Sequence, residues 1–136
     1  MTYLILVFVL AAIAFVVLLR SGTTMEWISP VTGRVVCLHF NNRLARLGGG
    51  VNNCMTLGPN DILISRDWIG SKTLSHEDGH TITAKIRGVL YLPWVLCGYI
   101  SKGIAKAKAE LEADHNMKNA HLYHAIGTVP SWAGNA

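Results

Sequence analysis

The sequence predicts an α+β fold, with a short antiparallel sheet and two long helices in one small domain that follows an apolar N-terminal helix. Three observations support this class. Residues 2–19 are almost entirely apolar and uncharged, two β-prone runs lie between residues 27 and 65, and two helix-like stretches follow from residue 71 onward. Because 136 residues suffice for one domain of ordinary size, we expect no second domain.

The N-terminal segment has the length and composition of a membrane-spanning helix. Residues 2–19 would extend about 27 Å as a helix, close to the ~30 Å hydrocarbon core of a bilayer. A cleaved signal peptide is the alternative, since Ala12-Ile13-Ala14 resembles a cleavage site, but no Lys or Arg precedes the run and apolar residues continue beyond that site. We predict a single-pass anchor over residues 1–20 and a folded domain over residues 21–136. A hydrophobic helix buried in a protein assembly is a third interpretation.

Charge and cysteine content indicate the compartment. Basic residues follow the apolar run and none precedes it, which favours a cytoplasmic domain: Arg20, Arg34, Arg43 and Arg46. The three cysteines are an odd number without C-x-x-C spacing, as in proteins of reducing compartments. The net charge of +4 is spread along the chain without a concentrated basic surface, so we do not expect nucleic-acid binding.

Turn residues and β-prone runs predict the strands. Residues 27–40 form a hairpin candidate, because Ser29-Pro30 and Thr32-Gly33 supply turns before a β-prone run that ends at Phe40. A glycine-rich loop follows at residues 48–53. After the turn at residues 56–60, Asp61–Ser65 reads as a short strand.

Capping residues predict the helices. Ser71 is a candidate N-cap for a helix that ends at about Arg87, before Gly88. Residues 88–100 are apolar but too short to span a bilayer, so we expect them in the core between the two helices. The alternative is an interfacial or substrate-facing loop, since its Tyr and Trp side chains suit the headgroup region. The last helix is predicted from about Gly103 to Ile126.

The first of these helices contains the motif His76-Glu77-Asp78-Gly79-His80, an H-E-x-x-H. Residues four apart lie on one helix face, so the two imidazoles can converge on one Zn²⁺. Glu77 adjoins the first His, so its carboxylate can accept a proton from an activated water without binding the metal. The alternative is an exposed polar helix face, because short motifs also occur by chance.

The second helix contains Glu110-Leu111-Glu112-Ala113-Asp114, which supplies a candidate third ligand. Glu110 and Asp114 share a helix face, so Glu110 can bind the metal while Asp114 hydrogen-bonds the outer ring nitrogen of a ligating His. Glu112 should point elsewhere and is the alternative ligand. A solvated acidic face paired with nearby lysines is the non-functional interpretation.

Together these two motifs resemble the gluzincin class of zinc metallopeptidases, and in particular its small, membrane-associated bacterial and phage forms. The match covers roughly Thr56 to Met117. The resemblance implies a minimal zincin-like domain with bound Zn²⁺ and a cleavable peptide or protein as substrate. It also implies that the Thr56–Ser65 stretch is an edge strand that pairs with the substrate. It assigns His76, His80 and Glu110 as ligands and Glu77 as catalytic base. Asp114 is assigned as the residue that hydrogen-bonds a ligating His.

Two departures from the family pattern are the acidic Asp78 inside the motif and the shortness of the domain. The leading hypothesis is a membrane-anchored zinc metalloendopeptidase. The rival is a non-catalytic structural or interaction subunit of a membrane or viral assembly that retains the scaffold. Further candidates for contacts to an oxyanion or substrate are His121 and Tyr123, with Tyr99 as an alternative donor.

Overall fold

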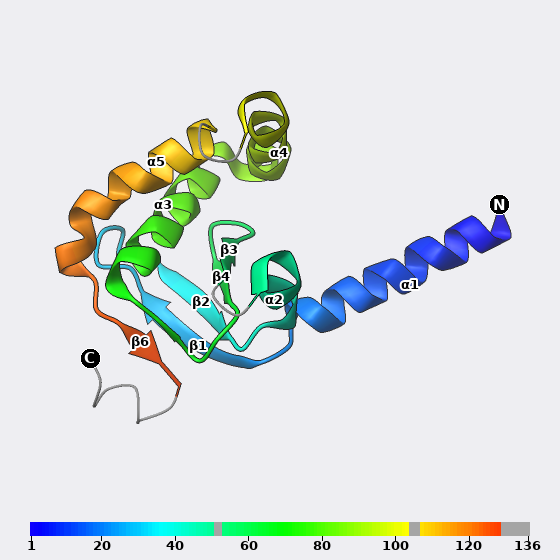
Figure 1. Cartoon of the computed structure of the whole chain (residues 1–136), viewed down its shortest axis with the longest axis horizontal. Coiled ribbons are helices and arrows are strands. Elements are labelled where there is room, and N and C mark those ends of the chain that lie inside the picture. The colour runs from blue at the N-terminus through cyan, green and yellow to red at the C-terminus, as the bar shows by residue number, and fades with distance from the viewer. Residues whose placement is uncertain (51–52, 104–106, 129–136) are drawn as a thin grey trace.

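The structure is a computed structural model that describes residues 1–50, 53–103 and 107–128. An apolar helix precedes a small mixed sheet, which is covered on one face by helices (Figure 1). The first half of the chain contains α1 (Thr2–Leu19), β1 (Thr23–Ile28), β2 (Val35–Phe40), α2 (Arg43–Gly49), β3 (Cys54–Thr56), β4 (Asp61–Ile64) and β5 (Trp68–Ile69). The second half contains α3 (Ser71–Arg87), η2 (Gly88–Leu90), α4 (Tyr91–Lys102), α5 (Lys108–Asn116), η3 (Met117–Leu122) and β6 (Ile126–Gly127).

The main sheet has the strand order β1-β2-β4-β3. The predicted hairpin is present, as β1 and β2 pair antiparallel from Thr23↔Phe40 to Ile28↔Val35. The prediction of an antiparallel sheet was wrong, because β4 pairs parallel to β2 while β3 pairs antiparallel to β4. The chain passes through α2 and the outer strand β3 before it returns as β4, so β4 runs in the direction of β2. This order makes β3 an edge strand of the sheet. The expectation that Thr56–Ser65 forms the edge was therefore wrong, because its strand β4 lies inside the sheet and only Thr56 belongs to the edge strand.

The core lies between the sheet and α3. Alternate residues of β2 point to one face, and Val36, Leu38 and Phe40 are fully buried there. They pack with Ile62 and Ile64 of β4 and with Leu74 of α3. The β-strand period of two therefore places the apolar side of the sheet beneath the helix that carries the H-E-x-x-H motif.

The helices α3 and α5 cross in close contact at Gly79. A Cβ atom at Gly79 would lie 2.7 Å from the Cα and 2.9 Å from the carbonyl oxygen of Ala113. Only a residue without a side chain allows α5 to approach this near. Below the crossing, the Asn116 side chain donates to the Ser75 carbonyl oxygen at 2.7 Å and fixes the register of the two helices.

Two predictions about α3 and the segment after it were wrong. The N-cap of α3 is Gly70 rather than Ser71. Residues 88–100 are not core: they form η2 and most of α4 and are largely exposed, and α4 tolerates Pro93 because it lies in the first turn.

The predicted helix Gly103–Ile126 is shorter than expected. Helix α5 covers Lys108–Asn116 and continues as the 3₁₀ turn η3, while residues 104–106 lie outside the described residues. Gly103 has a φ of 77° and ends α4 instead. Ile126 is extended because it pairs with Ile69 of β5.

Helix α1 projects from the domain with none of its residues buried, and it is long and apolar enough to cross a membrane. Its C-terminal end is nevertheless attached to the domain. The Asn42 side chain donates to the carbonyl oxygens of Leu18 at 3.3 Å and Leu19 at 2.9 Å, and the Arg43 amide donates to the Ser21 hydroxyl at 2.9 Å. These bonds fix where α1 leaves the domain (Figure 1).

Replacing Gly79 with Ala should lower the free energy of unfolding by about 1–3 kcal/mol, because the new methyl group overlaps the backbone of α5. Urea unfolding of the purified protein in detergent measures the difference. Gly98→Ala in α4 is the matched control, since its Cβ would lie 3.6 Å from the Ala107 Cβ, an ordinary contact. The control should be neutral or stabilising by up to ~1 kcal/mol. Equal stabilities of the two variants would contradict the close crossing.

Candidate metal centre

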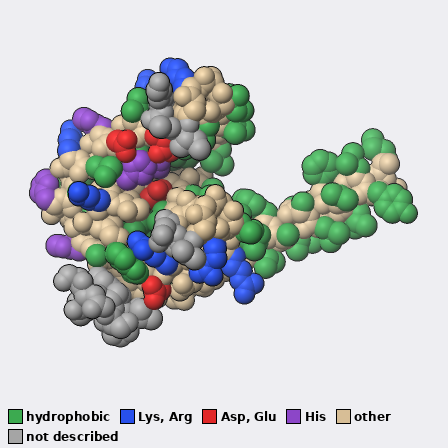
Figure 2. Space-filling model, viewed as in Figure 1, with side chains coloured by type: hydrophobic (Ala, Val, Ile, Leu, Met, Phe, Trp, Pro, Cys, Tyr) green, Lys and Arg blue, Asp and Glu red, His purple; other side chains and the backbone are tan. Residues whose placement is uncertain are grey.

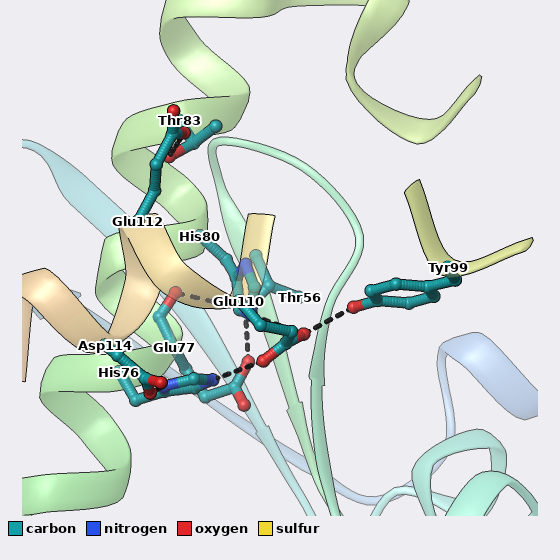
Figure 3. Close-up of polar contacts among 9 residues, drawn as sticks. All are labelled: Thr56, His76, Glu77, His80, Thr83, Tyr99, Glu110, Glu112 and Asp114. Atoms are coloured by element: carbon teal, nitrogen blue, oxygen red, sulfur yellow. Dashed lines mark hydrogen bonds and ion pairs between the residues drawn. The ribbon is translucent and has the colours of Figure 1, made fainter. Parts of the chain in front are cut away.

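Three predicted ligand side chains meet between α3 and α5. His76 and His80 lie one turn apart on α3, with ring centroids 4.9 Å apart and planes at 88°. Glu110 of α5 reaches both rings, with its Oε2 3.0 Å from His76 Nε2 and its Oε1 3.3 Å from His80 Nε2 (Figure 3). One ligand atom from each of the three residues lies within 4.8 Å of the other two. The structure thus brings together two motifs that are far apart in the sequence.

The donor set and its spacing fit a zinc ion. Zinc in proteins takes imidazole nitrogen and carboxylate oxygen at about 2.0–2.2 Å in a tetrahedral arrangement, so two of its ligand atoms lie about 3.3–3.5 Å apart. The two nitrogen–oxygen distances to Glu110 already approach this separation. A small shift of the Glu110 carboxylate would leave room for one ion between the three ligand atoms.

Asp114 hydrogen-bonds the His76 imidazole on the side away from Glu110. Its Oδ1 lies 2.8 Å from His76 Nδ1, the ring nitrogen that faces away from Glu110. When Nδ1–H donates to this carboxylate, the Nε2 lone pair of His76 faces the centre, as a metal ligand requires. The His80 Nδ1 atom differs, since it is buried without a hydrogen-bond partner in the described part of the chain.

Glu77 lies beside the imidazoles and is held by the edge strand. Its side chain is buried, and its Oε2 accepts a 2.6 Å hydrogen bond from the Thr56 hydroxyl of β3 (Figure 3). Burial raises the pKa of Glu77, which the charge of His80 partly opposes. A raised pKa suits a carboxylate that must take up a proton and release it again.

The pKa values of His76 and Glu110 depend on the hydrogen bonds between the candidate ligands. A hydrogen bond with Glu110 is the main cause that raises the pKa of His76 to about 8. Burial alone would raise the pKa of Glu110, but hydrogen bonds from His76, His80 and Tyr99 lower it well below its usual range. Without metal, the centre therefore holds an anionic carboxylate against an imidazole that keeps its proton up to about pH 8.

A cavity of about 400 Å³ opens beside the three ligands. One wall is β3 with the following Leu57, and the opposite wall is α4, which contributes Tyr91, Leu92, Val95 and Tyr99. The Tyr99 hydroxyl donates to Glu110 Oε1 at 2.5 Å. Acidic and histidine side chains gather in the hollow between α4 and the rest of the molecule (Figure 2). The volume lies in the range of small-ligand and peptide side-chain sites.

The remaining predicted residues lie elsewhere. Glu112 points away from the centre, with its carboxylate 3.2 Å from the Thr83 hydroxyl and 3.7 Å from an Arg87 nitrogen. His121 is exposed on η3. Tyr123 is buried in the core with its hydroxyl directed to Asp78 Oδ2 at 2.5 Å, so it does not face the cavity.

Asp78, the unusual acidic residue of the motif, is fully buried on the side of α3 away from the ligands. Its carboxylate accepts hydrogen bonds from the hydroxyl groups of Ser29, Thr81 and Tyr123 at 2.5–2.6 Å. It therefore ties α3 to the loop after β1 and to the segment after η3. Its charge is directed into the structure and away from the metal ligands.

Two residues that contact the candidate centre or its cavity were not predicted from the sequence. Thr56 holds Glu77, and Tyr91 lines the cavity at the start of α4. Thr56 was predicted in a turn and, by the resemblance, in the strand that pairs with the substrate, and Tyr91 in a core or interfacial segment, so neither was predicted to contact the centre. No spacing relates either residue to the H-E-x-x-H motif, so only the placement of β3 and α4 identifies them.

A second group of possible ligands lies on the opposite face of the sheet. His39 Nε2 is 2.8 Å from Asp61 Oδ1, and Cys37 is within reach of both. Burial, with Asp61 and Glu26 nearby, raises the pKa of the Cys37 thiol, which disfavours the thiolate that a metal requires. The Glu110 centre has the better donor set.

No family model, curated protein or solved structure matches this chain. The chemical interpretation of the centre therefore depends on its geometry.

Zinc affinity of the metal-free protein should rise with pH up to about 8 and then level off. The pKa of His76 is raised to about 8, so below that pH the metal must displace a proton, and affinity falls about tenfold per pH unit. Titration calorimetry in two buffers of different ionisation enthalpy counts the released protons. An affinity that is constant between pH 6 and 8 would contradict this coupling.

Replacing Tyr123 with Phe should lower the free energy of unfolding by about 1.5–3 kcal/mol, because Asp78 loses a hydrogen bond in the core. Zinc stoichiometry should stay unchanged. Tyr99→Phe is the contrasting variant, since its hydroxyl contacts Glu110, and it should alter zinc affinity more than stability. Denaturant unfolding and metal analysis of both variants provide the test. If Tyr123→Phe lost zinc at unchanged stability, Tyr123 would belong to the metal centre.

Proposed function

We propose that this protein is a membrane-anchored zinc metalloendopeptidase with a minimal, gluzincin-like centre. The observation that carries the proposal is the meeting of His76 and His80 with Glu110 at distances that suit one tetrahedral ion. Asp114 behind His76 and Glu77 beside the ligands complete the arrangement that the paired motifs imply. The zincin-like interpretation of the fold is part of this proposal.

Zinc, when bound by these residues, would supply Lewis acidity toward a peptide carbonyl and a nearby water. Glu77 accepts the proton of the attacking water and returns it to the leaving amine. The Thr56 hydroxyl orients the Glu77 carboxylate for both transfers through their 2.6 Å bond. Burial raises the pKa of Glu77, which favours the uptake of the proton that the second transfer requires.

The cavity walls support an extended peptide as substrate. Strand β3 is the edge of the sheet and forms one wall, so a peptide can pair with its free edge as an additional strand. Tyr91 and Tyr99 on the opposite wall keep their protons because burial raises the pKa of both hydroxyls. Tyr91 is therefore available as a donor to the oxygen that becomes negatively charged during attack, whereas Tyr99 donates to Glu110.

The proposal places the catalytic domain at a membrane. Helix α1 is uncharged and none of its residues is buried, which is costly in water and favourable in lipid. The excess of Arg after α1 favours the cytoplasmic face for the domain.

One observation favours the alternative of a non-catalytic structural or interaction subunit. Glu110 accepts hydrogen bonds from Tyr99 and contacts both imidazoles, so its carboxylate has partners without a metal. A scaffold protein could retain such a network. Stoichiometric zinc in the purified protein supports the peptidase and its absence supports the scaffold.

Replacing Glu77 with Gln should leave zinc bound and lower peptide cleavage by about 10²–10⁴-fold, because the proton acceptor is lost while the ligands remain. Metal analysis and hydrolysis of fluorescein-labelled casein by the detergent-purified protein measure the two effects. A zinc chelator should abolish the cleavage by the wild-type protein, and added zinc should restore it.

Glu112→Gln is the matched control, since this glutamate lies on α5 but points to Thr83 and Arg87. It should cleave like the wild type. The peptidase proposal is wrong if Glu77→Gln keeps full activity, or if the wild-type protein binds no zinc.

A further inference from the structure

Helix α4 and the residues before it expose a group of large apolar side chains. We call it the α4 ridge, formed by Ile86, Val89, Leu90, Leu92, Leu96 and Ile100. Val89 is 94% exposed, Ile100 77% and Leu96 60%. Leu92, Leu96 and Ile100 follow one another at intervals of four residues, so they form one stripe along α4. A soluble domain rarely exposes such a contiguous apolar stripe without a partner for it.

The direction of α1 indicates which partner covers the ridge. Helix α1 leaves the domain on the side where α4 lies (Figure 1). Hydrophobic side chains cover the face of α4 that is turned toward α1 (Figure 2). Because Asn42 and Ser21 attach the end of α1 to the domain, a bilayer crossed by α1 begins next to Leu19, at the level of α4.

Charged residues around the ridge suit a lipid surface. Lys85 and Lys102 are exposed at either end of the ridge, and Arg20 and Arg43 are exposed at the base of α1. Such cations attract anionic headgroups on the cytoplasmic leaflet.

We propose that the α4 ridge docks into the headgroup region of the same bilayer that α1 crosses. The protein then has two membrane contacts, and the domain sits on the membrane in one orientation. Val95 and Tyr99, which line the cavity, lie beside the ridge on α4, and Leu92 belongs to both, so the cavity opens next to the docked surface.

This orientation defines a substrate class, a step that rests on the proposed function. A peptide that pairs with β3 would run along the bilayer surface, between the edge strand and the docked helix. The substrate is therefore a polypeptide segment held at the membrane, such as the chain just outside another protein's membrane span. Soluble proteins would reach the cavity less often, since lipid limits access from that side.

Depth-dependent quenching of a fluorescent label tests the docking independently of catalysis. The full chain carries Leu96→Cys and Cys97→Ser, bears an environment-sensitive fluorophore at position 96, and is reconstituted in phosphatidylcholine–phosphatidylglycerol vesicles. The label should be quenched by shallow spin-labelled lipids and protected from aqueous iodide. A label at Lys118→Cys, on exposed η3, should show the reverse, and the Cys97→Ser protein reports background labelling of the two part-buried cysteines.

Two outcomes would overturn the docking. Equal iodide quenching at positions 96 and 118 would mean that the ridge stays in water. Protection from iodide without lipid quenching, increasing with protein density in the membrane, would mean that a second copy covers the ridge.

Cleavage by a ridge variant tests the substrate class. Leu96→Glu with Ile100→Glu should slow cleavage of a lipid-anchored peptide by about tenfold or more and leave a soluble peptide of the same sequence unaffected. Ile28→Glu is the matched control, because this exposed apolar residue of β1 is not part of the ridge. Equal losses on both peptides would contradict the substrate class. Lipid quenching by a protein that cleaves neither peptide would retain the docking and reject the peptidase.

Discussion

The candidate centre depends on the close crossing of α3 and α5 at Gly79. Because the Ala113 backbone lies where a side chain of residue 79 would be, α5 approaches near enough for Glu110 to reach both imidazoles. The contact also explains the small residue before the second His of the motif. Asn116 then fixes the register of α5, so that Glu110 faces the centre and Glu112 does not.

The polar groups around α3 are divided between its two sides. On the ligand side, Glu77 and Glu110 share a partly buried region with two histidines, where charges interact strongly. On the other side, Asp78 accepts three hydroxyl hydrogen bonds and connects distant segments. Neighbouring residues of one motif thus have different roles: Asp78 holds the fold, and Glu77 is available for proton transfer.

In the proposed docking, the membrane lies against the outer side of α4. The cavity lies between the edge strand β3 and the exposed helix α4 and is also lined by α3 and by Glu110 of α5. The apolar outer side of α4 and the adjacent anchor suggest that lipid supports the outer wall.

Local patterns in the sequence determined several features of this protein. The apolar run predicted α1, alternation and turn residues predicted the β1–β2 hairpin, and helical spacing placed His76 and His80 on one face. These features depend on residues close together in the chain, whose periodicity the backbone geometry dictates. The separation of Glu110 and Asp114 by one turn likewise predicted their different positions relative to His76.

Only the tertiary structure decided the rest. The parallel pairing of β4, the exposure of α4, the early end of α5 and the burial of Tyr123 each result from contacts between segments distant in the sequence. Residues 88–100 illustrate the reason, since an apolar helix has the same local pattern whether it lies in a core or against lipid. Which of these it contacts depends on where the other segments fold around it.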